Sequence, residues 1–180
     1  MNKPLYTKRN KSMRRSGSVM FRAMRLANEA LTPEQINTVL QRRTAGVLAV
    51  HGDAGYPYAV PLSYYFDGTH FYFHGAPVGH KMAAIQRDNR VSFCVVDRDV
   101  VAPAALTNEF RSVIAFGRVT IVTDPKRKRE LMRQFALHLA PDYAQKIHQH
   151  LEQGLDHFSL LEMTVAHMTG KEAADLAQSH

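Results

Sequence analysis

The fold is decided by three consecutive stretches: Tyr58-Ala-Val-Pro-Leu-Ser-Tyr-Tyr-Phe66, then Asp67-Gly68, then Thr69-His-Phe-Tyr-Phe-His74. The first and third are rich in aromatic and β-branched side chains, which favour strands. Asp-Gly between two such runs is typical of a hairpin, because both residues tolerate a positive φ. The pattern therefore predicts two antiparallel strands, over residues 58–66 and 69–74, joined by a tight turn.

A helix and a strand are predicted on the N-terminal side of this hairpin. Thr32 can cap a helix, Pro33 suits its first position and Gln35 completes a capping box. This helix is expected to end near residues 41–43. The apolar run at 45–51 then predicts a strand, and the Gly-rich residues that follow it predict a turn.

Helices and strands also follow the hairpin on its C-terminal side. The predicted elements are a loop at 75–79, a helix at 80–88, a strand at 91–96, a loop or short helical turn at 98–109, a strand at 110–122, helices at 125–139 and 142–153, and a strand at 158–167. The strand at 110–122 is expected to bend at Gly117. The tail from Gly170 is expected to be partly helical.

The order of these elements indicates the fold class. Hairpins and short connections favour an antiparallel sheet over alternating parallel units. Six strands can close into a small barrel, which removes exposed sheet edges. We therefore predict a mainly β or α+β fold, a six-stranded antiparallel barrel with flanking helices.

Length and charge indicate the domain organisation. The chain has 180 residues, which fits one domain with its own core, and its single cysteine excludes an intramolecular disulfide. The net charge of +7 is concentrated at the start, since residues 1–25 hold eight Lys and Arg and no acid. The remainder holds 15 basic and 16 acidic residues and is nearly neutral. We expect a basic N-terminal arm over residues 1–30 and one domain over 31–180.

Several classes of protein and site are not expected. No apolar run is long enough for a membrane span and no signal-peptide pattern is present, which predicts a cytoplasmic protein without a membrane partner. The basic arm keeps nucleic-acid binding as a minor alternative, and we do not expect it. His148 and His150 are two positions apart in a predicted helix and do not share a face. Without paired cysteines or HExxH, we predict no metal site.

Four stretches, in order along the chain, carry a resemblance to a known family. They are Tyr56-Pro-Tyr-Ala-Val-Pro-Leu-Ser-Tyr64, Tyr72-Phe-His-Gly-Ala-Pro-Val-Gly-His-Lys81, Phe110-Arg-Ser-Val-Ile-Ala-Phe-Gly-Arg118 and Thr169-Gly-Lys-Glu172. Together they resemble the pyridoxamine 5'-phosphate oxidase-like FMN-binding split-barrel superfamily, and within it the 5-nitroimidazole reductase (Nim) group. The resemblance implies a split-barrel homodimer that holds one FMN in each of two clefts at its interface.

The resemblance also implies which residues bind the cofactor. The strand formed by Val60, Pro61, Leu62, Ser63 and Tyr64 would lie along the isoalloxazine ring. Pro61 lacks an amide hydrogen, which suits a strand edge, whether that edge faces a ligand or solvent. His80 and Lys81 stand where a strand leads into a helix, a junction that favours a phosphate group.

A catalytic role is implied for one further residue, and cofactor contacts for three more. His74 matches a histidine near the flavin in the Nim group, where it could orient substrate or donate a proton. A packed or surface histidine is the alternative. Arg111 and Ser112 match a motif near the dimer cleft, although Arg111 could instead form only an ion pair at the dimer interface. Lys171 could reach the flavin or only hold the tail in place.

The resemblance implies an FMN-dependent oxidoreductase. In such enzymes the flavin carries the redox chemistry, and the protein supplies binding, orientation and electrostatics. The implied acceptor is a small flat nitroaromatic compound such as a 5-nitroimidazole, with nitroimidazole resistance as the consequence. One alternative is a flavin, haem or deazaflavin protein that binds or senses without turnover. Pyridoxamine phosphate oxidase itself is not expected, because its Arg-rich C-terminal ending is absent.

Overall fold

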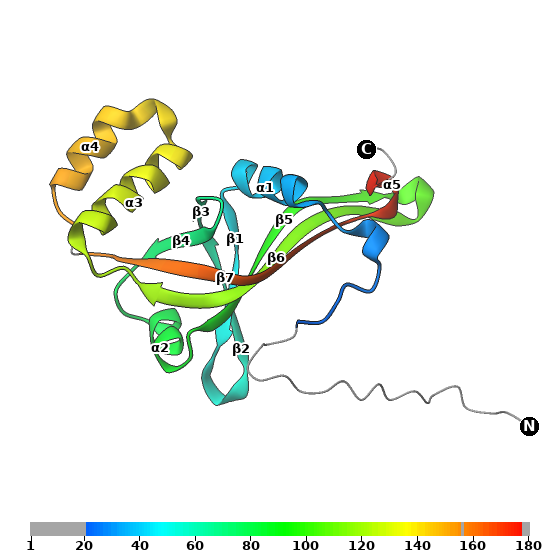
Figure 1. Ribbon diagram of the computed structural model, residues 1–180, viewed down its shortest axis with the longest axis horizontal. Coiled ribbons are helices and arrows are strands. Elements are labelled where there is room, and N and C mark those ends of the chain that lie inside the picture. Colours follow the sequence, from blue (N-terminus) through cyan, green and yellow to red (C-terminus); the bar gives the residue numbers. More distant parts are fainter. Residues whose placement is uncertain (1–20, 156, 178–180) are drawn as a thin grey trace, which may run out of the picture.

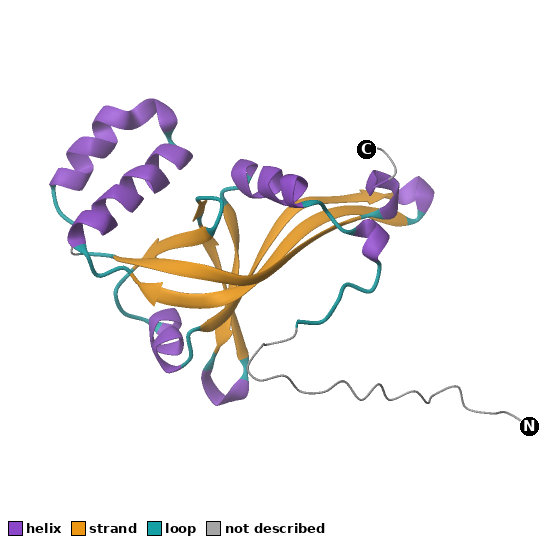
Figure 2. Cartoon of the chain, in the orientation of Figure 1, coloured by secondary structure: helices purple, strands orange, loops and turns teal. Residues whose placement is uncertain are grey.

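The computed structural model describes residues 21–155 and 157–177, which form one twisted sheet flanked by helices (Figure 1, Figure 2). In chain order the elements are η1 (Ala27–Glu29), α1 (Pro33–Arg42), β1 (Ala45–His51), η2 (Asp53–Gly55), β2 (Pro57–Ser63), β3 (Tyr65–Phe66), β4 (His70–Gly75), α2 (His80–Arg87), β5 (Arg90–Ala102), η3 (Pro103–Ala105), β6 (Thr107–Ile121), α3 (Pro125–Leu139), η4 (Pro141–Tyr143), α4 (Ala144–Glu152), β7 (Ser159–Glu172) and α5 (Ala174–Ala177).

The sheet has the strand order β2-β1-β5-β6-β7-β4-β3, and each pair of neighbouring strands is antiparallel. The mixed α+β class and the antiparallel sheet are therefore confirmed. The predicted count of six strands is wrong, because the expected strand at 58–66 divides at Tyr64 into β2 and β3. The backbone N–H of Tyr64 donates to the Thr44 carbonyl while its side chain turns into the core.

The long hairpin of β5 and β6 corrects a second prediction. Residues 98–109 are predicted to form a loop or a short helical turn. A short helical turn is present at η3, but the residues on either side of it continue both strands. Charged and polar side chains pair across this extension: Arg98 with Glu109, and Asn108 with Asp99 at 2.7 Å. These polar residues hide the strand pattern in the sequence. The last strand is also longer than predicted and runs to Glu172 rather than to residue 167.

The main core lies between the inner face of the sheet and α1. The predicted capping box is confirmed, since the Thr32 and Gln35 side chains each accept from the other's backbone N–H. Ile36, Val39 and Leu40 of α1 are buried on this face. A cluster of aromatic rings fills its centre, comprising Tyr64, Phe66, Phe71, Phe73 and Phe93. Burial of such large rings contributes much of the stability of a small domain.

A second, smaller core joins α3 and α4 to the ends of β4 and β7. It contains Tyr72, Phe135, Leu151 and Leu160, all of them buried. Figure 1 shows α3 and α4 as a helical pair that stands beside the sheet at one end, while the tips of β5 and β6 lie at the other. The N-cap of α3 is Asp124, whose carboxylate accepts from the backbone N–H of Lys126 and of Arg127.

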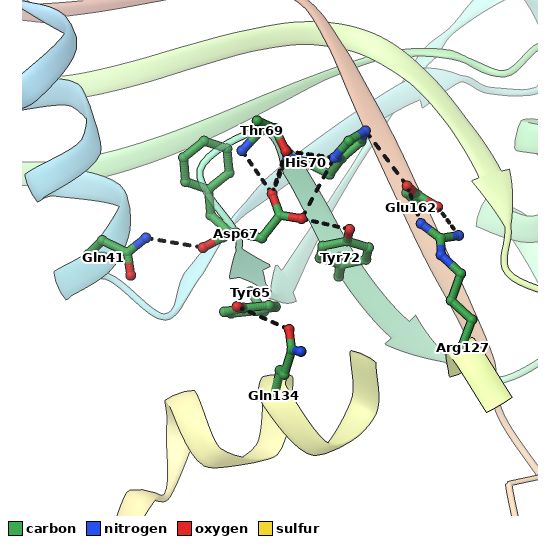
Figure 3. Close-up of polar contacts among 10 residues, drawn as sticks. Gln41, Tyr65, Asp67, Thr69, His70, Tyr72, Arg127, Gln134 and Glu162 are labelled. Atoms are coloured by element: carbon green, nitrogen blue, oxygen red, sulfur yellow. Dashed lines mark hydrogen bonds and ion pairs between the residues drawn. The ribbon is translucent and has the colours of Figure 1, made fainter. Parts of the chain in front are cut away.

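A polar network ties this helical pair to the strands (Figure 3). Arg127 of α3 forms a two-bond ion pair with Glu162 of β7, at 2.6 and 2.7 Å. Asp67 lies in the turn between β3 and β4, where its carboxylate accepts from the backbone N–H of Thr69 and His70 and from the Tyr72 hydroxyl. The predicted Asp-Gly turn is present between β3 and β4, and its aspartate also orients β4. The predicted pairing of residues 58–66 with 69–74 holds only at Tyr65 and Phe66, because β2 pairs with β1 instead.

The Asp67 carboxylate makes stability depend on pH. Burial by itself would raise the pKa of Asp67, but hydrogen bonds from His70, Thr69 and Tyr72 outweigh it and hold the pKa below the ordinary 3.8. A lowered folded-state pKa stabilises the fold above the unfolded pKa, and this is lost as pH falls through the folded value. We expect Asp67→Asn to lower the free energy of unfolding by about 1 to 2 kcal/mol at pH 7.

Urea unfolding across pH measures this effect. The difference between wild type and Asp67→Asn should be largest at neutral pH and shrink below pH about 4, where the wild-type carboxylate becomes protonated. A difference that stays constant with pH would contradict an electrostatic origin.

The outer face of β1, β5 and β6 is apolar and open. Residues directly opposite one another share a face, and Val47, Cys94 and Ile114 are such partners. Two further exposed side chains of this face are Val96 and Phe116. We refer to Val47, Cys94, Val96, Ile114 and Phe116 as the outer face. A contiguous apolar surface of this kind indicates an interaction site.

Part of the predicted N-terminal arm lies on the sheet. Phe21 stacks on His167 with ring centres 4.7 Å apart and also contacts Phe116. Ala30 bridges to Lys171, so residues 21–30 are in contact with the domain. Residues 1–20 of the predicted arm lie outside the described part of the chain.

The bend predicted at Gly117 coincides with a register shift between β6 and β7. A Cβ at Gly117 would lie 2.2 Å from the carbonyl oxygen of Thr164, which is backbone and cannot move aside cheaply. We expect Gly117→Ala to lower the free energy of unfolding by about 2 kcal/mol in urea. Thr120→Ala, at an exposed position of the same strand, is the control and should change it by less than about 0.5 kcal/mol. Equal effects of the two would contradict the steric argument.

Candidate functional site

The junction of β4 and α2 brings His74, Gly75 and Lys81 together. A Cβ at Gly75 would lie 2.5 Å from Nζ of Lys81, so the lysine folds back over the glycine backbone. Within the described residues, Lys81 has no hydrogen bond or ion pair. Gly79, with φ 120°, ends the loop and starts α2 without a side-chain cap. The first amides of α2 and the Lys81 ammonium therefore form a cationic corner suited to an anion.

His74 lies beside this corner at the end of β4. His74 is exposed as a residue, but its ring packs edge-on against two aromatic rings. The ring centres are 5.0 Å apart for Phe135 and 6.3 Å apart for Phe158. Partial burial of the ring, followed by the positive charge of Lys81, lowers the pKa of His74 from its ordinary 6.5. The imidazole is consequently neutral at pH 7 and can accept a proton or donate a hydrogen bond.

His80 lies close to the predicted cofactor strand but is already engaged. Its ring stacks on Tyr58 of β2 at 4.0 Å, and Nε2 is 3.3 Å from a carboxylate oxygen of Asp53. Arg87 binds the same carboxylate at 2.8 Å. This arrangement fixes the start of α2 against β2, and it leaves Lys81 as the cation at the corner without a carboxylate partner.

The strand β2 is an edge strand, as Pro61 requires. Val60 and Leu62 pack against the core, while Pro61 and Ser63 are exposed. The Tyr64 side chain is different, because it is fully buried and its hydroxyl donates to the Leu40 carbonyl at 2.9 Å. Burial raises the pKa of Tyr64. Its side chain is therefore a core group, and only the backbone of this residue can face a ligand.

Arg111 lies in a buried ion-pair network rather than on an open surface. Its guanidinium contacts Glu172 at 2.7 Å and Asp97 at 3.5 Å, and both carboxylates are buried. Asp97 also accepts from Arg42 at 2.7 Å and from Arg43 at 2.9 Å. Burial would raise the pKa of Asp97, but the two arginine hydrogen bonds outweigh it and lower the value. The network joins α1, β5, β6 and β7.

Lys171 and Ser112 lie near this network. Nζ of Lys171 is 2.9 Å from Glu29 and 4.9 Å from the centre of the Phe110 ring, so it holds the η1 segment on the sheet. The segment that Lys171 holds is on the N-terminal side of α1 and is not the tail of the predicted alternative. Ser112 pairs with Val96 and Lys171 and is half-buried at the margin of the outer face.

The predicted site residues thus form two groups within one chain. The first lies at the junction of β4 and α2 and includes His74 and Lys81, and the second comprises Arg111, Ser112 and Lys171. His74 pairs with Leu160 at the start of β7, whereas Lys171 lies eleven residues further along it. At 3.3 Å per residue, the strand between these positions spans about 36 Å. One flavin cannot contact both groups of the same chain, so any shared site needs the second group from another copy.

The Asp97 network was not anticipated from the sequence. Its signal was nonetheless present, since Asp97 follows the apolar run Phe93-Cys-Val-Val96, and Arg42 and Arg43 end a helix. An acid within a buried strand requires charged partners.

A comparison with protein families decides the identity of this fold. A family model described as pyridoxamine 5'-phosphate oxidase matches residues 32–172. The chain belongs to this family. The antiparallel sheet with flanking helices agrees with the split barrel of the pyridoxamine 5'-phosphate oxidase family. No curated protein matches the chain.

Solved structures share the fold of this family member. A proposed 5-nitroimidazole antibiotic resistance protein from Bacteroides thetaiotaomicron is 20% identical with a TM-score of 0.65, over 79% of this chain and 86% of that one. The flavocytochrome Anf3 from Azotobacter vinelandii is 21% identical with a TM-score of 0.66, over 84% and 72%. A FAD-binding protein from Mesorhizobium loti is 25% identical with a TM-score of 0.58, over 80% and 96%.

A metal-binding cluster and a membrane-spanning helix are both absent from residues 21–155 and 157–177. No group of three or more His, Cys, Asp or Glu side chains is placed to hold a metal ion there. No helix in that part of the chain is long and apolar enough to cross a membrane.

Proposed function

We propose that this member of the pyridoxamine 5'-phosphate oxidase family binds FMN and acts as an oxidoreductase. The observation that carries the proposal is the Lys81 ammonium, which lies over Gly75 without an anionic partner among the described residues. Two observations point to the same cofactor. The family includes flavin proteins, and the cationic corner at Lys81 suits a phosphate. The similarity to a FAD-binding protein supports a flavin in general.

The residues of the chain fit FMN in three respects. Lys81 and the first amides of α2 would hold the phosphate. The free edge of β2, from Val60 to Ser63, offers backbone groups to the polar rim of the ring. His74, neutral and packed against Phe135, is placed to orient an acceptor or exchange a proton with it. FMN, when bound and reduced by a nicotinamide or chemical donor, would pass the electrons on to the acceptor.

A small nitroaromatic compound, such as a 5-nitroimidazole, is the proposed acceptor. The structural similarity to a proposed 5-nitroimidazole resistance protein supports this choice. His74 and the aromatic side chains around it suit a flat acceptor that stacks on rings.

We further propose that the protein is a homodimer formed through the outer face. Its exposed apolar side chains need a partner surface, and the two groups of predicted site residues are about 36 Å apart along β7 within one chain. Two copies can bring Arg111, Ser112 and Lys171 of one copy near His74 of the other. Sedimentation equilibrium should give twice the mass of the chain, and a monomer would contradict the proposal.

A binding or sensing protein without turnover is the second candidate. The similarity to a flavocytochrome supports a version of this candidate that holds haem as well as or in place of a flavin. Reduction of a nitroimidazole by a chemical or nicotinamide reductant separates the two candidates.

The first experiment is the absorption spectrum of the purified protein, with the released cofactor identified by mass. A yellow protein that releases FMN at about one per chain supports the proposal. A colourless protein that also fails to bind added FMN would refute it, and a Soret band would favour haem.

A further inference from the structure

A cavity of about 680 Å³ lies between α3, α4 and the end of β4. Phe135 and Ala136 line it from α3, Ile147 and His150 from α4, and His74 forms part of its wall. Its volume is in the range of sites that hold small organic molecules. It is separate from the β2 edge and from the Asp97 network.

The cavity exists because two helical faces meet without filling the space between them. The lining residues of α3 recur at Met132, Phe135, Ala136 and Leu139, a helical stripe of the kind that normally packs against a partner. Small side chains at Ala136, Ala140 and Gly154 leave this interior hollow. The Arg127–Glu162 ion pair and the Tyr65–Gln134 hydrogen bond hold α3 on the strands (Figure 3). These contacts therefore keep the cavity in place beside His74.

The chemistry of the lining indicates the kind of molecule that fits. Phe135, Phe158 and Tyr143 present aromatic rings, which favour an aromatic guest. The charged or titratable lining residues that the structure describes are Lys146 and histidines, with no carboxylate. Lys146 and His150 are one turn apart on α4, exposed, and without an ion-pair partner in the described chain.

We propose that this cavity binds a small aromatic molecule that carries a negative charge, with the ring between α3 and α4 and the anionic group at Lys146 and His150. The basic N-terminal arm is a poor occupant, because residues 1–25 hold eight cations and no acid. The proposal rests on the proposed function in one respect: if His74 serves a flavin, the cavity selects aromatic acids as acceptors.

Calorimetric titration of the full-length protein with naphthoate and with its neutral amide, naphthamide, tests the proposal. We expect naphthoate to bind about tenfold more tightly than naphthamide, since the exposed Lys146 ammonium faces its carboxylate and the His150 ring can donate a hydrogen bond to it. Lys146→Gln should weaken naphthoate about fivefold and leave naphthamide unchanged. Ala136→Phe fills the cavity and should weaken both ligands by more than about tenfold.

Two matched variants control for general effects. Lys126→Gln removes an exposed lysine of α3 that does not line the cavity, and Ala144→Phe adds a ring at an exposed position of α4. Both should bind naphthoate like the wild type. Undiminished naphthoate binding by Ala136→Phe, equal affinities for the two ligands, or no binding at millimolar concentrations would each overturn the proposal.

The flavin content of the same samples separates this proposal from the proposed function. A yellow protein that does not bind naphthoate refutes only the cavity proposal. A colourless protein that fails to bind added FMN but binds naphthoate as expected refutes only the flavin proposal. Lys146→Gln lies on the protein surface and should not impair folding, so it keeps the test valid if Ala136→Phe fails to fold.

Discussion

Lys81→Ala is expected to weaken FMN binding about 10- to 100-fold, because a charge-assisted hydrogen bond to phosphate contributes about 1.5 to 3 kcal/mol. Lys81 lies over the Gly75 backbone with no carboxylate to pair with in the described structure, so removing it leaves no buried acid unpaired. The fold should therefore remain intact. Fluorescence titration of the cofactor-free protein with FMN measures the loss.

Riboflavin, which lacks the phosphate, provides the internal control for this prediction. Its affinity should be nearly the same in wild type and Lys81→Ala, since only the phosphate contact changes. Lys126→Ala, at an exposed lysine of α3, should bind FMN as the wild type does. If Lys81→Ala weakens riboflavin and FMN equally, the lysine supports the ring or the fold rather than the phosphate.

The same variant has a second measurable consequence at His74. Burial is the larger cause of the lowered pKa of His74, and the charge of Lys81 is the second cause. Removing the lysine charge should raise the pKa of His74 toward its ordinary value, and a phosphate bound at Lys81 should act in the same direction. Histidine titration by NMR measures both shifts.

Local signals in the sequence predicted much of the fold. The capping box at Thr32 and Gln35 and the turn at Asp67-Gly68 depend on residues a few positions apart, and both are present. The strand before the turn pairs with β4 only at Tyr65 and Phe66, because the partner of β2 is the more distant β1. The extension of β5 and β6 could not be predicted in this way. The side-chain contacts across it, such as Arg98 with Glu109, join residues eleven positions apart, and the charges of these residues remove the apolar alternation that marks a strand.

The candidate site was less accessible to sequence reasoning. Motif order placed His74 and Lys81 correctly beside each other, because only a short loop separates β4 from α2. It could not reveal that Arg111 is committed to Glu172 and Asp97, since these partners come from distant strands. The cavity beside His74 depends on how far α3 stands from α4, which no periodicity encodes.

His74→Ala is expected to reduce turnover of a nitroimidazole about 100-fold while leaving the FMN content unchanged, a magnitude typical of a positioned acid or base. The ring contacts Phe135 and Phe158 and is not in an ion pair. The pairing of His74 with Leu160 is made by the backbone, so loss of the ring should leave β4 in place. Steady-state reduction of the nitro compound, with flavin absorbance recorded on the same sample, measures both quantities.

Two further variants distinguish chemistry at His74 from packing. His74→Gln can donate a hydrogen bond but cannot titrate, so it should lose the wild-type dependence of turnover on pH. Added imidazole should restore part of the activity of His74→Ala, because the deleted ring leaves room for it beside Phe135. The wild-type pH dependence should follow a group whose pKa lies below 6.5, the ordinary value, since burial and then Lys81 lower it. Full turnover in His74→Ala would instead make this histidine a packing residue at the edge of the α3–α4 cavity.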